Sequence, residues 1–196
     1  MSRDTTIGAD ERGVAAQFLI DNLGLVDPTA EAESNSTAAH RLPSLAGARG
    51  VLLDNTKGNA GPLLRHVGVL LEQQYGVQSF KMARKLVYSR PADPSLLDEL
   101  ARDYDFVVTG VGACGSCTSG CVRDAVELEA RGVPTAAIHT EIFMNSAMAH
   151  STAFGRPDLQ FAAVEHPIAA VSDQELQRRA AALVDSVAAV LLGAAV

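Results

Sequence analysis

The residues best suited to chemistry are three cysteines that fall within one short stretch. Cys114, Cys117 and Cys121 occupy the segment GACGSCTSGC at residues 112–121, and the sequence contains no further cysteine. Disulfides that hold a fold together usually close longer loops, so this tight cluster favours redox, nucleophilic or metal chemistry. The glycines between the cysteines let a substrate approach the backbone closely.

The cysteine segment is predicted to lie where a buried strand turns into a helix. Cys114 and Cys117 then form a C-x-x-C motif at the helix N-terminus, where backbone N–H groups and the helix dipole lower the pKa of a thiol. We therefore predict that Cys114 is the attacking thiolate and that Cys117 is the resolving thiol that closes a disulfide. The residues around them, Gly112, Ser116 and Thr118, are predicted to contact the substrate.

The same cysteines allow two other interpretations. Cys121 lies one turn beyond Cys117 on the same predicted helix face, so Cys114, Cys117 and Cys121 could together bind a zinc ion or an iron–sulfur cluster. Alternatively, the C-x-x-C could be a non-catalytic redox sensor that changes its partners on oxidation. The enzyme interpretation requires no bound cofactor, but a reductive reaction needs an external thiol reductant for turnover.

A second polar loop, DNTKGNAGP at residues 54–62, follows the first predicted strand. Lys57 lies among small polar residues ahead of a helix, so its ammonium group and the helix amides can bind a carboxylate or a phosphate. We predict that Asn55, Lys57 and Asn59 orient an anionic small-molecule substrate. No G-x-x-x-x-G-K-[ST] motif occurs, and no G-x-G-x-x-G motif has an acidic residue at the required distance. Nucleotide and dinucleotide binding are therefore not predicted.

Two predicted strands end in a histidine. One ends in His139, followed by Glu141, and the other ends at His166, both toward the same edge of the predicted sheet. Because the strand of His139 is expected beside the cysteine strand, we predict His139 as the general acid or base and Glu141 as a substrate contact. A basic run near the second predicted strand is interpreted as a solvated face and comprises Lys81, Arg84, Lys85 and Arg90.

Five short apolar runs alternate with helical patterns from Arg49 onward. This alternation is typical of βαβ units in a mainly parallel sheet that is covered on both faces. The predicted strands lie at residues 50–54, 77–83, 105–111, 134–140 and 159–165. Helix starts are marked by Asp93 before Pro94 and by a capping box of Ser172 and Glu175.

The sequence predicts a single three-layer α/β domain over residues 49–196. Right-handed crossovers favour a flavodoxin-like five-stranded sheet with the strand order 2-1-3-4-5. Ligands of such sheets bind where the winding reverses, between strands one and three. The polar loop at residues 54–62 and the cysteine segment should therefore face each other.

The N-terminal part and the overall charge bear on where the protein is located and what it binds. Residues 1–48 are predicted to be a partly ordered arm with one helix from Val14 to Leu23. The 16 Lys+Arg against 23 Asp+Glu give a net charge of −7, which disfavours binding to nucleic acid or anionic membranes. No secretory signal and no run of about 18 apolar residues occur, so a cytoplasmic protein is predicted. Candidate partners are a small-molecule substrate, a thiol reductant protein and, from the small apolar residues of the last helix, a second copy of the chain.

The segment CGSCT at residues 114–118, after a strand that ends in TGVG, resembles the UGSC-motif (seleno)protein family, in which selenocysteine or cysteine opens the Gly-Ser-Cys motif. KGNA at residues 57–60 and SRP at residues 89–91 add to the resemblance, which covers roughly residues 49–170. It places Cys114 at the selenocysteine position and so implies a nucleophile or redox centre. It also implies a distant likeness to the selenoprotein B subunits of glycine and proline reductases, where a selenolate cleaves a bond next to a carbonyl. The implied activity is that of a thiol-dependent oxidoreductase, lyase or hydrolase that cleaves a carbon–heteroatom bond.

Overall fold

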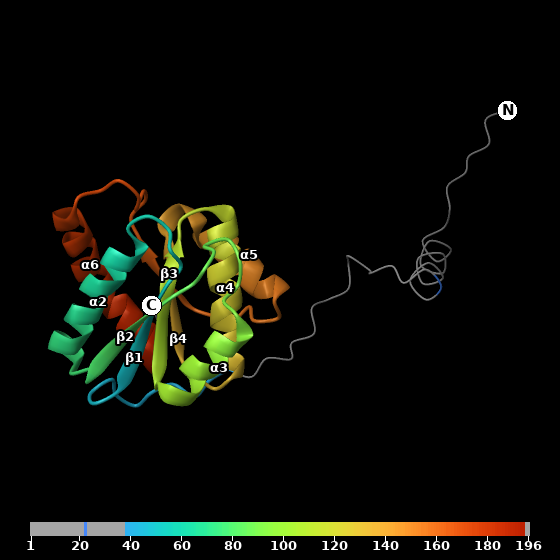
Figure 1. The fold of residues 1–196 in the computed structure, drawn as a ribbon, viewed down its shortest axis with the longest axis horizontal. Helices are drawn as coiled ribbons and strands as arrows, with labels where there is room; N and C mark the ends of the chain where they lie inside the picture. Colours follow the sequence, from blue (N-terminus) through green and yellow to red (C-terminus); the bar gives the residue numbers. More distant parts are fainter. Residues whose placement is uncertain (1–21, 23–37, 195–196) are drawn as a thin grey trace. The chain divides into compact units, whose positions relative to one another are not determined.

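The computed structural model describes Asn22 and residues 38–194. Residues 38–194 contain a five-stranded parallel sheet with helices on both faces (Figure 1). The strand order, β2-β1-β3-β4-β5, confirms the predicted order 2-1-3-4-5. The strands are β1 (Arg49–Asp54), β2 (Ser79–Arg84), β3 (Phe106–Gly112), β4 (Thr135–Thr140) and β5 (Phe161–Val164).

Two layers of helices bury the sheet. One face is covered by α2 (Ala60–Tyr75) and α6 (Asp173–Leu192). The other face is covered by α3 (Pro94–Asp103), α4 (Gly115–Ala130) and α5 (Met144–Ala153), and a short 3-10 helix, η1 (Glu141–Phe143), joins β4 to α5. The central strand β3 is buried along its whole length, which is typical of a parallel strand covered on both sides.

The predicted helix starts are confirmed by their caps. The Asp93 side chain accepts the Ser95 N–H at 2.9 Å ahead of α3, and Pro94 occupies the first turn. The Ser172 hydroxyl accepts the Glu175 N–H at 3.2 Å ahead of α6. These bonds fix the helix starts because N–H groups of a first turn lack partners within the helix.

Residues 38–48, which the sequence assigns to the arm, pack against the sheet domain. Ala39 and Leu45 are buried. The guanidinium group of Arg41 binds both oxygens of the Glu129 carboxylate, at 2.8 and 2.7 Å. The packed domain therefore begins before residue 49, because this short segment carries its own anchors.

Two other predictions can be compared with the structure only over the described residues. The helix predicted from Val14 to Leu23 lies outside them, apart from Asn22, which is helical. Among the helices that the structure describes, none is long and apolar enough to cross a membrane.

Candidate active site

The loop after β1 and the end of β3 are joined by one side chain, that of Asn55. Its Nδ2 donates to the Val111 carbonyl at 2.9 Å, and the Val111 N–H donates to its Oδ1 at 3.0 Å. The Asn55 N–H also donates to the Gly110 carbonyl at 3.0 Å. The two loops that were expected to face each other are therefore in direct contact at the carboxyl edge of the sheet.

Cys114 and Cys117 are joined in a disulfide at the start of α4. Their Cα atoms are 5.2 Å apart, and Cys114 is the N-cap residue of the helix. The Cys117 N–H donates to the Cys114 sulfur at 3.3 Å, and the Ser116 hydroxyl lies 3.8 Å from the same sulfur. Cys114 is partly exposed whereas Cys117 is fully buried, so an incoming molecule reaches Cys114 first.

Cys121 differs from the other two cysteines because it is a free, fully buried thiol. The side-chain amide of Asn55 donates to its sulfur at 3.4 Å. Burial raises the pKa of Cys121 to about 12, and the nearby charge of Lys85 opposes this effect only in part. At neutral pH Cys121 is therefore a protonated thiol with little nucleophilic character.

Two of the residues predicted to orient the substrate are used by the chain itself. Asn55 is fully buried, and its amide is occupied by Val111 and Cys121. The Nδ2 of Asn59 donates to the carbonyls of Ile168 and Val171, at 3.0 and 3.1 Å, and so ties the β1 loop to the connection between β5 and α6. Both asparagine amides therefore hold parts of this edge of the sheet together.

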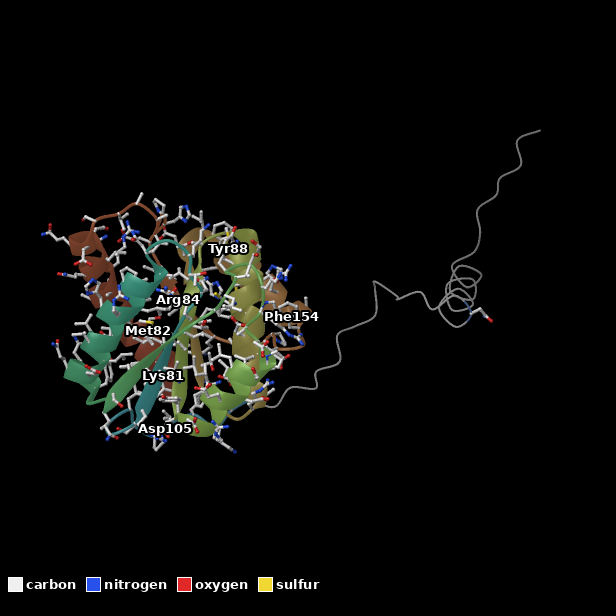
Figure 2. The ribbon with its side chains drawn as sticks, in the orientation of Figure 1. Lys81, Met82, Arg84, Tyr88, Asp105 and Phe154 are labelled. Atoms are coloured by element: carbon white, nitrogen blue, oxygen red, sulfur yellow. A yellow bond between two sulfur atoms is a disulfide. The ribbon has the colours of Figure 1, made fainter. Side chains whose placement is uncertain are left out.

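Lys57 and Arg84 bring positive charge to the same edge of the sheet. The Lys57 ammonium lies 5.0 Å from the centre of the Tyr88 ring, a cation–π distance. Arg84, at the end of β2, forms an ion pair with the buried Asp54 at 3.2 Å. Figure 2 shows Arg84 and Tyr88 toward the carboxyl end of the strands. An anionic group bound at this edge would meet cations from two neighbouring elements.

Lys85 is buried, which corrects the interpretation of the whole basic run as a solvated face. Its ammonium lies 2.5 Å from the Asp124 carboxylate on α4, and the Ala92 N–H donates to the other oxygen of that carboxylate at 2.6 Å. Burial raises the pKa of Asp124, and the charge of Lys85 opposes this shift. One carboxylate on the cysteine helix thus holds both ends of the loop at residues 86–91, which carries Tyr88.

His139, the predicted acid or base, is fully buried behind the end of β3. A Cβ added at Gly112 would collide with its Nδ1 atom, so the imidazole lies directly against the Gly112 backbone. It also packs edge-on against Phe161, with ring centroids 5.0 Å apart. Within residues 38–194 neither ring nitrogen has a hydrogen-bond partner, and the same is true of the Thr118 hydroxyl. Burial lowers the pKa of His139 to about 3, so the imidazole is neutral at physiological pH.

A second histidine reaches this edge from the loop after β5. His166 is half-buried, and its Nδ1 lies 3.2 Å from the Thr140 hydroxyl. That hydroxyl donates to the Gly112 carbonyl at 3.4 Å, which links His166 to the chain two residues before Cys114. Glu141, predicted to contact the substrate, is exposed at the start of η1 at the same edge.

Sequence reasoning missed the pairing of Lys85 with Asp124. A signal for Lys85 exists, because the alternation of β2 buries Ala83 and so directs the residue two positions further inward. Asp124 falls in the buried stripe of α4 together with Cys117 and Cys121, where an unpaired carboxylate is unfavourable. A buried base and a buried acid on neighbouring elements indicate an ion pair.

The fold and the site define the class of protein: an α/β protein of flavodoxin-like strand order that carries a cysteine pair where the winding of its sheet reverses. Within the part of the chain described here, no three His, Cys, Asp or Glu side chains are grouped so that they could hold a metal ion. The family model of the UGSC family matches residues 24–193, and the chain therefore belongs to the UGSC family. No curated protein matches the sequence.

Proposed function

We propose that the chain is a cytoplasmic thiol-dependent enzyme that uses Cys114 as a nucleophile on a small anionic organic substrate. The asymmetry of the cysteine pair supports this most strongly, because Cys114 is partly exposed and its disulfide partner Cys117 is fully buried. A reductive cleavage needs an accessible attacking thiol backed by a protected resolving thiol. The pair also lies at the edge of the sheet where doubly wound folds bind ligands.

The start of α4 favours the thiolate form of Cys114 once the disulfide is reduced. The Cys117 N–H donates to the Cys114 sulfur at 3.3 Å, and the unpaired N–H groups of the first helical turn stabilise negative charge there. The thiolate would take the place of the side-chain oxygen that commonly caps a helix. Lys57 and Arg84 at the same edge favour an anionic substrate.

The proposed reaction is the reductive cleavage of a carbon–heteroatom bond next to a carbonyl group. The Cys114 thiolate displaces the heteroatom group X from the substrate R–X, which forms a sulfur–carbon bond and releases X⁻. Cys117 then attacks the Cys114 sulfur, and the electron pair of the broken sulfur–carbon bond goes to carbon, where the carbonyl stabilises it until a proton is added. The balance is R–X plus two thiols giving R–H, HX and one disulfide. An external thiol reductant restores the pair by thiol–disulfide exchange.

Two histidines are candidates for the proton transfers, and they face different constraints. His139 is neutral and fully buried against Gly112, so its ring nitrogens are not exposed to solvent. His166 is half-buried and is linked to the site through Thr140. We therefore include His166 beside His139 as a candidate for protonating the leaving group or the carbon.

The test uses the fully reduced chain without oxygen and a panel of small carboxylates that carry a halogen, amino or thioether group beside the carboxyl group. We expect one disulfide per molecule of product, measured by intact mass and product analysis on the same sample. Cys117→Ser should stop after the first step and accumulate a substrate adduct on Cys114. Cys121→Ser is the matched control and should react like the unaltered chain.

Three outcomes would overturn the proposal. One is product formation by Cys114→Ser, because the nucleophile would then lie elsewhere. Another is stoichiometric iron or zinc with all three thiols protected from alkylation, because the cysteines would then be ligands. The third is oxidation of the pair by peroxide without turnover of any carboxylate, which would favour a redox sensor.

A further inference from the structure

The outer face of α2 has an apolar centre with opposite charges on either side. Arg65, Val69 and Glu72 lie on one stripe of the helix because they are spaced by four and three residues. All three are exposed, and Val69 keeps 48% of its surface. Within residues 38–194 neither Arg65 nor Glu72 forms an ion pair at 4 Å or less, although the charge of Arg65 helps to lower the pKa of Asp173. The face therefore carries a positive and a negative side chain that no ion pair at 4 Å or less holds in place within the described residues.

Val69 forms a ridge between two hollows. The larger hollow, of about 340 Å³, lies between α2 and β2 and takes its apolar lining from Leu52, Phe80 and Met82. The smaller one, of about 230 Å³, lies between α2 and α6 and is lined by Leu70 and Ala181. Figure 2 shows Met82 beside α2. Apolar surface on both sides of an exposed valine is suited to a partner with side chains that enter the hollows.

We propose that this face docks a second copy of the chain, with the two α2 helices antiparallel across a two-fold axis near Val69. Arg65 and Glu72 lie about 6 Å and about 4.5 Å along the helix axis from Val69, on opposite sides. The two-fold rotation reverses the helix, so Arg65 of each copy meets Glu72 of the other. Val69 of each copy then enters a hollow beside the α2 helix of the other.

The charge pattern selects this arrangement over a parallel one. Parallel helices would place Arg65 against Arg65 and Glu72 against Glu72, and contacts between like charges are unfavourable. Along α2 the order is positive, apolar, negative. When a second copy runs in the opposite direction, each positive side chain faces a negative one, as an interface between identical surfaces requires. Of the small apolar residues of α6 that suggested a subunit contact, Ala180 and Val187 are buried in the chain's own core, whereas Ala181 is exposed and lines the smaller hollow.

Charge reversal tests the interface directly, with the mass of the full reduced chain measured by sedimentation equilibrium over a range of concentrations. We expect a dimer. Arg65→Glu and Glu72→Arg should each weaken the dimer about tenfold or more, because each places two like-charge contacts in the symmetric interface. The double variant Arg65→Glu/Glu72→Arg restores opposite charges and should restore the dimer. Arg123→Glu, which makes the same change of charge on α4, is the control and should have no effect.

A monomer at every concentration would overturn the proposal. A dimer that neither single substitution weakens would also overturn it, because the contact would then lie elsewhere. Equal weakening in the single and double variants would contradict the facing of Arg65 and Glu72, since rescue is the signature of two charges that meet. Val69→Asp, at the predicted axis, supplies a second route and should give a folded monomer by circular dichroism.

Discussion

The two edges of the sheet treat buried polar groups differently. At the amino edge, the buried Glu129 carboxylate is fully used: Arg41 binds both oxygens, and two backbone N–H groups also donate to it. At the carboxyl edge, the Thr118 hydroxyl and both ring nitrogens of His139 have no partner within residues 38–194. Both edges pair their buried carboxylates, but the carboxyl edge also buries a hydroxyl and an imidazole that have no partner within residues 38–194.

The difference is consistent with the proposed function, in which the carboxyl edge binds the substrate. A buried polar group without a partner costs about 1–3 kcal/mol, so unpaired groups are uncommon in stable cores and call for an explanation. At the carboxyl edge the unpaired groups lie near the cysteine pair, where the proposed function expects the substrate. The amino edge has one smaller exception, Arg156, which binds Asp158 but leaves one guanidinium nitrogen unpaired within the described residues.

The largest effect that would sharpen this comparison is expected among the cysteines. In the reduced protein at neutral pH, an alkylating reagent should modify Cys114 at least about a thousand times faster than Cys121, because burial blocks access to Cys121 and raises its pKa to about 12. Intact mass over time with peptide mapping measures both rates. In denaturant the cysteines should react alike. Rapid labelling of Cys121 in the native protein would show that the interior of this edge is open.

At the amino edge, Glu129→Ala should lower the free energy of unfolding by about 3 kcal/mol. The substitution leaves Arg41 and two backbone N–H groups without the carboxylate that accepts their hydrogen bonds. Urea unfolding of the reduced chain measures the loss. The matched control is Glu165→Ala, whose exposed ion pair with Arg178 should contribute far less to stability because solvent screens it. Cys114 reactivity should stay unchanged in both variants. Similar losses of unfolding free energy in the two variants would show that the buried Glu129 carboxylate stabilises the fold no more than an exposed one.

At the carboxyl edge, His139 should make stability depend on pH. Its pKa of about 3 in the folded state lies below the value near 6.5 of an unfolded chain, chiefly because of burial and to a smaller extent because of His150 on α5. Above pH 6.5 neither state binds the proton, so His139 adds no pH dependence. As the pH falls from about 6.5 toward 3, the unfolded state gains a proton that the folded state refuses, and stability is lost.

The variant His139→Leu isolates this contribution. Between about pH 7 and pH 5 the wild-type chain should lose about 2 kcal/mol more of its unfolding free energy than the variant loses. Urea unfolding at each pH measures the two slopes. If the unfolding free energies of both chains fell equally with pH, His139 would take up a proton in the folded state. The conclusion that its ring is buried without a partner would then be wrong.

The smallest effect concerns the contact between Gly112 and His139. Gly112→Ala should destabilise the chain by about 1.5 kcal/mol, because the added methyl group collides with the imidazole. The double variant Gly112→Ala/His139→Ala should recover part of that cost relative to His139→Ala alone, which thermal melts can measure. Simple additivity of the two substitutions would show that the cost of Gly112→Ala does not come from contact with the imidazole.

The fold was predictable because its signals are local. Alternating apolar runs place all five strand starts within two residues of those observed, and the caps at Asp93 and Ser172 need only neighbouring residues. The strand order follows from the handedness of crossovers and the reversal of winding. The same rules bring the loop after β1 to the cysteine segment, so the location of the candidate site was also within reach of the sequence.

The sequence could not predict which side chains of the site are already hydrogen-bonded within the chain, because their partners lie far away in the sequence. Asn59 is bound by the carbonyl of Ile168, 109 residues later, so its amide is already occupied. Arg41 meets Glu129 across 88 residues, which draws residues 38–48 into the domain. A sequence shows which residues can donate hydrogen bonds, but it does not show which donors the folded chain has already used.

Asp124 anchors the loop of residues 86–91 at both ends, through Lys85 and through the Ala92 N–H. The end points of this loop are therefore set on the cysteine helix, whatever the residues between them are. The residues of this segment, which include the exposed Leu86 and Tyr88, can thus be replaced while the positions of its two ends stay the same. Segments of other length or shape can therefore be grafted between the two anchors without moving the Lys85 and Ala92 contacts to Asp124.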